Sequence, residues 1–193
     1  MENAPKILAF AGSARSGSWN RKLIRIAAAG ARGAGAEVTL IELRDYALPL
    51  MDEDLETREG MPAAARKLKD LFLAHQGLLL ACPEYNSSIT PLLKNVIDWV
   101  SRPVPGEAPL GCFAGKVAAL MSASPGVFGG LRGLVTVRMI LGNIKVMVLP
   151  DQVAIPRAHE SFSDDGSLKD SKLQASVEAV GTQLARTLSK LCA

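Results

Sequence analysis

The chain has few of the side chains that supply acid–base or metal chemistry on their own. Only two histidines, His75 and His159, occur among its 193 residues. They lie far apart in the sequence, and neither has the neighbouring groups that a catalytic base requires. We therefore expect both to be surface residues, and we expect neither a catalytic triad nor a metal site.

Cysteine is equally scarce. Cys82, Cys112 and Cys192 form an odd set without a C-x-x-C spacing, which argues against a disulfide framework and a zinc site. Cys82 lies in an apolar run, where a thiol usually packs as a small, inert hydrophobic group. The cysteines are expected to be free thiols in a reducing cytoplasm.

Long hydrophobic runs and a strong charge excess are also absent. No segment reaches the roughly 18 apolar residues of a membrane-spanning helix, and residues 1–6 do not resemble a signal peptide. The 22 basic and 19 acidic residues are scattered and give a net charge of +3. That charge is too weak and dispersed to predict nucleic-acid binding, but it suits small ligands that carry phosphate.

The apolar residues are arranged in five short runs that alternate with helical patterns. The runs predict strands at 6–11, 37–43, 77–82, 116–121 and 145–149. Helices are predicted near 21–34, 62–74, 90–101, 129–141 and 169–191. Without a repeat or a linker, the pattern predicts a single α/β domain over residues 1–193. Its fold is a doubly wound five-stranded parallel sheet with helices on both faces.

Two connections carry no element in this prediction. Residues 44–61 form an irregular loop, which is longer than most and therefore a candidate functional segment. The stretch after residue 149 is irregular up to the last helix. Ligands of doubly wound sheets bind at the carboxyl ends of the strands, so the functional residues are expected in the loops that follow strands one, three and four.

The first loop, residues 12–20, has the composition of an anion site. It combines two glycines, three serines, an arginine and an asparagine ahead of a helix. Free amides at a helix N-terminus bind phosphate readily, and Arg15 adds a charged donor. The spacing matches neither a Walker A motif nor a dinucleotide fingerprint. A single phosphate monoester is the better match, although an ordinary turn with Ser18 or Asn20 as N-cap explains part of the pattern.

The second and third loops supply different groups. Residues 83–91 combine an aromatic ring, an amide, hydroxyls and prolines. Such a loop could hold a flat heteroaromatic ring through its backbone, but an ordinary turn has similar residues. Residues 122–130 contain three glycines and two serines before a helix, which favours close approach by a ligand or a flexible turn.

Three motifs resemble one known family. They are Gly-Ser-x-Arg-x-x-Ser-x-Asn at 12–20, Pro-Glu-Tyr-Asn at 83–86 and Leu-Lys-Asn-x-Ile-Asp-Trp at 93–99. Together they resemble the NADPH-dependent FMN reductase family, which includes bacterial quinone, azo and chromate reductases. The resemblance extends from the first strand to the helix after the third loop, and it implies a flavodoxin-like fold and FMN as cofactor.

The resemblance also implies roles for individual residues. Ser13, Arg15, Ser18 and Asn20, together with the neighbouring Trp19, would bind the FMN phosphate region. Pro83, Glu84, Tyr85 and Asn86 would line the isoalloxazine ring, and Ser124 would contact the flavin. Lys94, Asn95 and Asp98 are interpreted as structural or interfacial. Members of the family are usually homodimers or homotetramers packed through the 90–101 helix and its neighbour.

The implied activity is NAD(P)H-dependent reduction of a small-molecule acceptor. A flavin carries the hydride chemistry itself, so no catalytic side chain is expected. Two alternatives remain at this point. One is a flavodoxin-type electron carrier, against which the positive net charge counts. The other is a non-catalytic module that binds a different phosphate ester.

Overall fold

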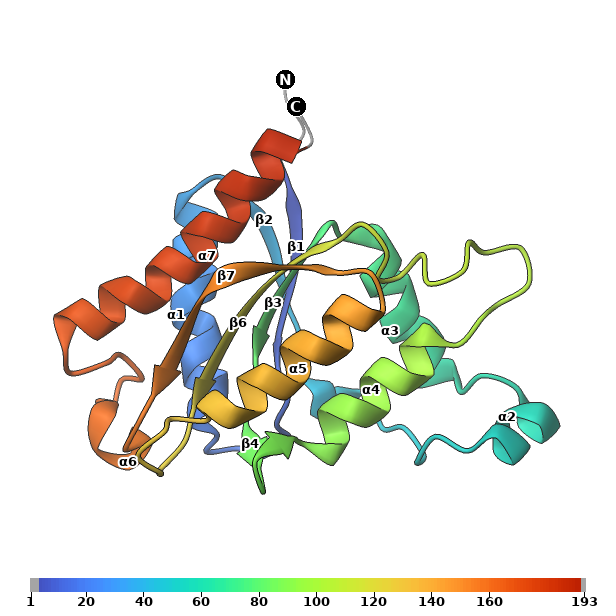
Figure 1. Ribbon diagram of the computed structural model, residues 1–193, viewed down its shortest axis with the longest axis horizontal. Coiled ribbons are helices and arrows are strands. Elements are labelled where there is room, and N and C mark those ends of the chain that lie inside the picture. Colours follow the sequence, from blue (N-terminus) through green and yellow to red (C-terminus); the bar gives the residue numbers. More distant parts are fainter. Residues whose placement is uncertain (1–3, 192–193) are drawn as a thin grey trace.

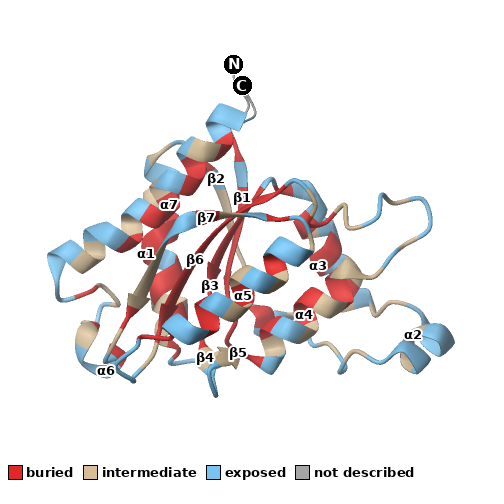
Figure 2. Ribbon diagram, viewed as in Figure 1, coloured by how far each residue is buried: buried red, intermediate tan, exposed pale blue. Residues whose placement is uncertain are grey.

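The computed structural model describes residues 4–191, and five of its strands form one parallel sheet (Figure 1). The strand order is β2-β1-β3-β6-β7. The strands are β1 (Lys6–Ala11), β2 (Glu37–Leu40), β3 (Gly77–Ala81), β6 (Val117–Ala123) and β7 (Met147–Ile155). The predicted doubly wound α/β sheet is confirmed, and the strands at its centre are buried on both faces (Figure 2).

Helices cover both faces of this sheet. The helices are α1 (Trp19–Gly33), α2 (Glu53–Glu59), α3 (Ala63–Ala74), α4 (Pro91–Ser101), α5 (Leu131–Asn143), α6 (Ala158–Ser161) and α7 (Ser171–Leu191). Side chains alternate along each strand, so Ile7 and Leu79 pack under α1 and α7. Leu8 and Leu80 pack on the opposite face under α3, α4 and α5.

The strand order creates a switch point between β1 and β3. From β1 the chain crosses to β2 at one edge, and it then returns across β1 to form β3. Loops that follow β1 and β3 therefore diverge toward opposite faces of the sheet and leave a crevice at their carboxyl ends. The first and second loops line the two sides of this crevice.

Several element predictions are wrong in detail. β2 ends at Leu40, and the chain then forms a 3-10 turn, Leu43–Asp45. The loop 44–61 contains α2, because Asp52 caps its N-terminus by accepting from the amides of Asp54 and Leu55. The short helix α6 lies in the stretch expected to be irregular.

The fifth strand is longer than the 145–149 prediction. β7 continues through Pro150 to Ile155, and its pairing with β6 shifts register between Ala118 and Leu120. A proline is tolerated here because β7 is an edge strand and the irregularity leaves that position without a ladder partner. Residues 150–155, predicted to be irregular, are therefore part of a strand.

His75 is buried, which contradicts its prediction as a surface residue. Its Nδ1 lies 2.6 Å from the carbonyl oxygen of Leu71, and its Nε2 lies 2.8 Å from the hydroxyl of Thr39. Both ring nitrogens thus have partners within the fold, which offsets the cost of burial. His159 is exposed, as predicted.

Cys82 and Cys112 are free and buried, whereas Cys192 lies outside the described residues. Burial raises the pKa of Cys82 to about 12 and also raises the pKa of Cys112. Both side chains are therefore thiols at neutral pH. Between residues 4 and 191, no helix is long and apolar enough to cross a membrane. The same residues contain no cluster of His, Cys, Asp and Glu suited to a metal ion.

Candidate functional site

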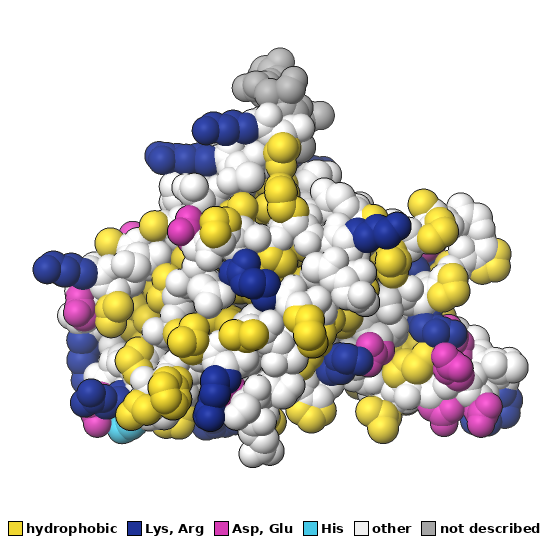
Figure 3. Space-filling model, viewed as in Figure 1, with side chains coloured by type: hydrophobic (Ala, Val, Ile, Leu, Met, Phe, Trp, Pro, Cys, Tyr) yellow, Lys and Arg dark blue, Asp and Glu magenta, His cyan; other side chains and the backbone are white. Residues whose placement is uncertain are grey.

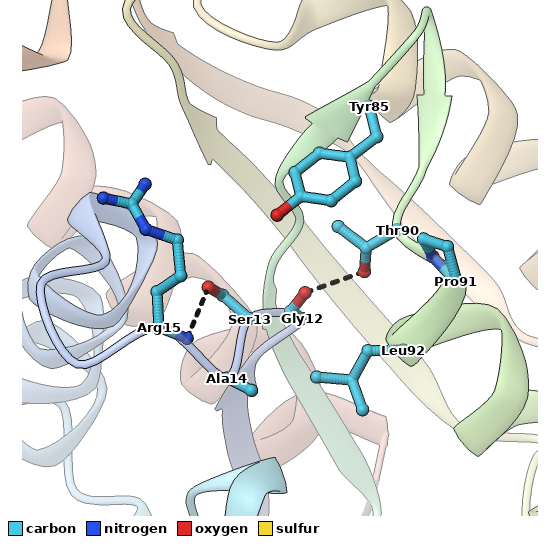
Figure 4. A pocket seen from close by; sticks show the side chains of 8 residues that line it. All are labelled: Gly12, Ser13, Ala14, Arg15, Tyr85, Thr90, Pro91 and Leu92. Atoms are coloured by element: carbon cyan, nitrogen blue, oxygen red, sulfur yellow. Dashed lines mark hydrogen bonds between the residues drawn. The ribbon is translucent and has the colours of Figure 1, made fainter.

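A pocket of about 350 Å³ opens at the switch point (Figure 4). Its volume falls in the range of about 300–1,000 Å³ that is typical of small-molecule sites. One wall comes from the loop after β1 and the other from the hairpin and helix start after β3. The lining residues are Gly12, Ser13, Ala14, Arg15, Tyr85, Thr90, Pro91 and Leu92.

The first loop has unpaired backbone donors. Among residues 13–20, only the amides of Arg15 and Ser18 have hydrogen-bond partners within residues 4–191, on Ser13 Oγ and the Arg15 carbonyl. Ser18 begins α1 with an extended backbone, and its hydroxyl does not cap the helix. Successive free amides at a helix N-terminus bind anions such as phosphate. The loop therefore fits a phosphate group.

Arg21 fixes the orientation of this loop. Its Nη1 donates to the carbonyl oxygens of Arg15, at 3.2 Å, and Ser16, at 3.0 Å. Its Nε and Nη2 bind Glu42 at 2.6 and 2.7 Å. In a trans peptide the N–H points opposite to the C=O, and the described chain has no cis peptide bond. The amides of Ser16 and Gly17 thus point away from Arg21 and stay available.

Arg15 is the cation at the pocket. Its side chain is exposed, and its guanidinium lies 5.6 Å from the centre of the Trp19 ring. This cation–π contact orients the charge without neutralising it. Trp19 is only partly buried and packs against the core under α1, so it supports Arg15 from outside the pocket lining.

The second loop forms a small hairpin, which the sequence did not predict. Its strands are β4 (Glu84–Tyr85) and β5 (Ser88–Ile89), and Asn86 and Ser87 form the turn with positive φ angles of 49° and 68°. Two such residues are typical of a type I′ turn. The hairpin extends Tyr85 over the pocket with its hydroxyl directed toward the first loop (Figure 4), and 51% of Tyr85 is exposed.

Some expected site residues are not part of the pocket lining. Asn20 is buried and binds the backbone of Ala123, whereas Glu84 binds the start of α5. Asn86 lies at the exposed tip of the hairpin. The backbone of Ser124 is bonded to Ile155 and Ala158. The pocket therefore brings together three of the expected residues, Ser13, Arg15 and Tyr85.

Thr90, Pro91 and Leu92 line the pocket but were not selected from the sequence. Thr90 is the N-cap of α4 and accepts from the Leu93 amide at 3.2 Å, with Pro91 in the first turn. A Thr-Pro pair before an apolar helix is a recognisable N-terminal signal. The predicted helix 90–101 already placed a helix start at this edge, but its partial positive charge was not used to select these residues.

The motif at 93–99 stabilises a neighbouring loop, in agreement with its structural interpretation. The Asn95 side chain accepts from the Met51 amide at 2.8 Å and donates to the Pro49 carbonyl at 2.9 Å. Trp99 donates to the same carbonyl at 2.8 Å. Lys94 and Asp98 form an exposed ion pair one helical turn apart. Asn95 and Trp99 therefore hold the chain before α2 against α4.

The chain matches one family of known proteins. Residues 5–160 match the model of the family described as NADPH-dependent FMN reductase. The chain is 36% identical over 179 residues to an NAD(P)H-dependent FMN reductase of Pseudomonas aeruginosa, covering 92% of each chain. It is 34% identical over 149 residues to a quinone reductase of Escherichia coli, covering 77% of this chain and 76% of the relative.

A solved structure has the same architecture. The flavoenzyme NAD(P)H:acceptor oxidoreductase from Paracoccus denitrificans superimposes with a TM-score of 0.80 at 28% identity, covering 96% of this chain and 98% of the other. The fold is thus the flavodoxin-like fold of flavoenzymes. The chain belongs to the NADPH-dependent FMN reductase family and is an oxidoreductase whose cofactor is FMN and whose co-substrate is NAD(P)H.

Proposed function

We propose that the protein binds FMN in the pocket between β1 and β3 and reduces quinone-type acceptors with NAD(P)H. One observation carries the proposal: the amide-rich first loop with Arg15 and the aromatic second loop face one cavity. FMN held by these loops would supply the hydride and electron transfer between the nicotinamide and a second substrate. Azo compounds, free flavin and metal oxyanions are further candidate acceptors, because an open face of the flavin ring would accept substrates of different shapes.

The chain's own residues bind and orient the cofactor in this proposal. The free amides of the first loop, Ser13, Ser18 and Arg15 would hold the phosphate. Trp19 would support Arg15, and Asn20 would fix the loop that carries these groups. Tyr85, Thr90 and Leu92 would flank the ring. Pro83 is buried beside Gly12 and would shape the pocket floor, while Asn86 and Ser124 would approach the ring from the hairpin tip and the third loop.

Residues 1–193 are proposed to act as one FMN-binding domain in a homodimer or homotetramer. The five strands of one sheet already extend from Lys6 to Ile155, which supports a single unit. A cytoplasmic location is proposed as well, because Cys82 and Cys112 are free thiols and such thiols persist in reducing compartments.

An anaerobic titration tests the function. The purified protein is loaded with FMN, freed of excess flavin and mixed with NADPH or NADH. We expect the flavin absorbance to bleach and to return when a quinone is added. Bound flavin that stays oxidised would support an electron carrier instead, and protein that cannot retain FMN would contradict the proposal. Specificity constants over a quinone panel then rank the acceptors.

A further inference from the structure

Three side chains connect the loops of the site in pairs. Thr90 Oγ1 in the second loop donates to the carbonyl of Gly12 in the first, at 2.7 Å (Figure 4). Asn20 at the end of the first loop bonds to Ala123 in the third through both its polar atoms, at 2.8 and 3.0 Å. Glu84 in the second loop accepts from the amide of Gly133, just beyond the third loop, at 3.1 Å. One side chain thus joins the first loop to the second, one joins the first to the third, and one joins the second to the helix that follows the third.

These bonds are protected from water. Thr90 and Asn20 are each only 3% exposed, and the Glu84 side chain is 9% exposed. Buried polar groups without partners are costly, so each side chain strongly favours the one backbone geometry that satisfies it. The bonds span 78, 103 and 49 residues along the chain, so they constrain loops that the sequence separates widely.

The residue types match their partners chemically. One carboxamide carries both a donor and an acceptor, which is what the C=O and N–H of Ala123 need. Glu84 presents a carboxylate to the first turn of α5, where the N-cap is Gly130 without a side chain. A negative charge at a helix N-terminus is favourable, and Arg132 binds the same carboxylate at 3.0 Å.

We propose that Thr90, Asn20 and Glu84 are positioning residues that hold the three loops in their ligand-binding arrangement before FMN arrives. This inference rests on the proposed function and assigns Asn20 and Glu84 a role other than direct contact with the flavin. Ordering loops on binding reduces affinity, so loops that are already fixed bind their ligand more tightly. The loss of one inter-loop bond should loosen the partner loop in the protein without ligand.

The test combines hydrogen exchange with FMN titration. The full chain is freed of flavin, and amide exchange is measured by mass spectrometry for wild type, Asn20→Ala, Thr90→Val and Glu84→Gln. The FMN dissociation constant is measured by fluorescence quenching. The matched control is Thr182→Val, which removes a hydroxyl bond to the Gly30 carbonyl at 3.1 Å, far along the chain from the three loops.

In Asn20→Ala, we expect faster exchange across residues 123–130 and FMN binding at least tenfold weaker. In Thr90→Val, exchange should increase in the first loop, again with weaker binding. Glu84→Gln keeps an acceptor and should show the smallest change. Thr182→Val should lower thermal stability by less than Thr90→Val, because it removes one part-buried bond and no helix cap, and should leave the FMN affinity within twofold of wild type.

Two results would overturn the inference alone. One is weaker FMN binding with unchanged exchange in the partner loop, which indicates direct contact with the ligand. The other is unchanged FMN affinity in all three variants. If the wild-type protein itself does not bind FMN, the proposed function fails and this inference fails with it.

Discussion

Arg21 orients the first loop by binding its backbone carbonyl groups, although Arg21 does not line the pocket itself. Because it binds the carbonyls of Arg15 and Ser16 and is itself fixed by Glu42, the loop amides keep one direction. The sequence had marked Arg15 as the relevant cation. The structure adds that a second arginine, six residues on, binds the loop carbonyls and so leaves the amides of Ser16 and Gly17 free.

Arg15 should discriminate FMN from flavin without phosphate. We expect Arg15→Ala to weaken FMN binding about tenfold, because a charge-assisted bond to phosphate is lost, and to leave riboflavin binding unchanged. Arg186→Ala is the control, since Arg186 is also on the exposed surface but lies on α7, outside the pocket lining. Equal losses for FMN and riboflavin, measured by fluorescence quenching, would exclude a phosphate contact.

Cys82 precedes the second loop but should not react. Burial raises its pKa to about 12, so almost no thiolate is present at pH 8, and the thiolate is the reactive form. Cys112 donates to the carbonyl of Val100 and has a raised pKa as well. We expect iodoacetamide at pH 8 to leave both unlabelled in native protein and to label both in guanidinium. Native labelling of Cys82 would show that this strand end opens.

At the scale of elements, α1 and α7 approach closely because of two glycines. A Cβ at Gly30 would overlap the backbone carbonyl of Glu178, and one at Gly181 would overlap that of Ala27. Gly33, at the end of the same helix α1, is exposed, and a Cβ added there would meet no described residue outside its own helical turn within 4 Å. Within α1, Gly30 therefore has no room for a side chain, whereas Gly33 does.

Alanine at Gly30 and alanine at Gly33 are expected to change stability in opposite directions. Gly30→Ala should lower the free energy of unfolding by about 1–3 kcal/mol, because the new methyl group forces the helices apart. Gly33→Ala should raise it by about 0.5–1 kcal/mol, because alanine restricts the unfolded chain and favours the helix. Urea unfolding followed by circular dichroism measures both, and a loss of stability in Gly33→Ala would contradict the packing described here.

The elements that the sequence predicted well are those whose signal is local. Apolar runs such as Gly77–Ala81 are buried on both faces, and their length distinguishes them from helices. The extension of β7 past Pro150 was missed because it depends on the strand's position at an edge. The hairpin at Asn86 was missed because its turn lacks the glycine that usually marks a type I′ turn.

The sequence predicted the position of the candidate site better than the contacts within it. The switch point, Ser13, Arg15 and Tyr85 follow from the order of strands and from the motifs. The partners of Asn20 and Glu84 do not, because a long-range bond to Ala123 or Gly133 is decided by tertiary packing. His75 was assigned to the surface for the same reason, since Thr39 and Leu71 satisfy it only in the folded state.

At the scale of the whole molecule, one face is unusually apolar. Leu131, Val135 and Met139 lie four residues apart along α5 and are 42%, 64% and 67% exposed. Hydrophobic side chains gather over this helix in front of the sheet (Figure 3). By contrast, the apolar residues of α4 face the core. Exposed apolar stripes of this kind mark interaction surfaces, so α5 is the expected contact in a homo-oligomer.

A single charge on α5 should therefore change the assembly. We expect wild-type protein to elute as a dimer or tetramer and Val135→Glu to elute at a lower mass, measured by light scattering, because a carboxylate cannot be buried there without a partner. Leu191→Glu is the control, since Leu191 is similarly exposed, at 61%, at the end of α7. A monomeric wild type, or an unchanged mass for Val135→Glu, would contradict this interface.

The bond between Asn20 and Ala123 has a consequence for biosynthesis. It joins residues 103 positions apart, and β3 must insert between β1 and the much later β6. On the ribosome, the first loop is therefore synthesised long before the residues that hold it in place. At the proposed site, FMN would meet all three connected loops only after translation has passed Gly133, which would make flavin loading a late event in synthesis.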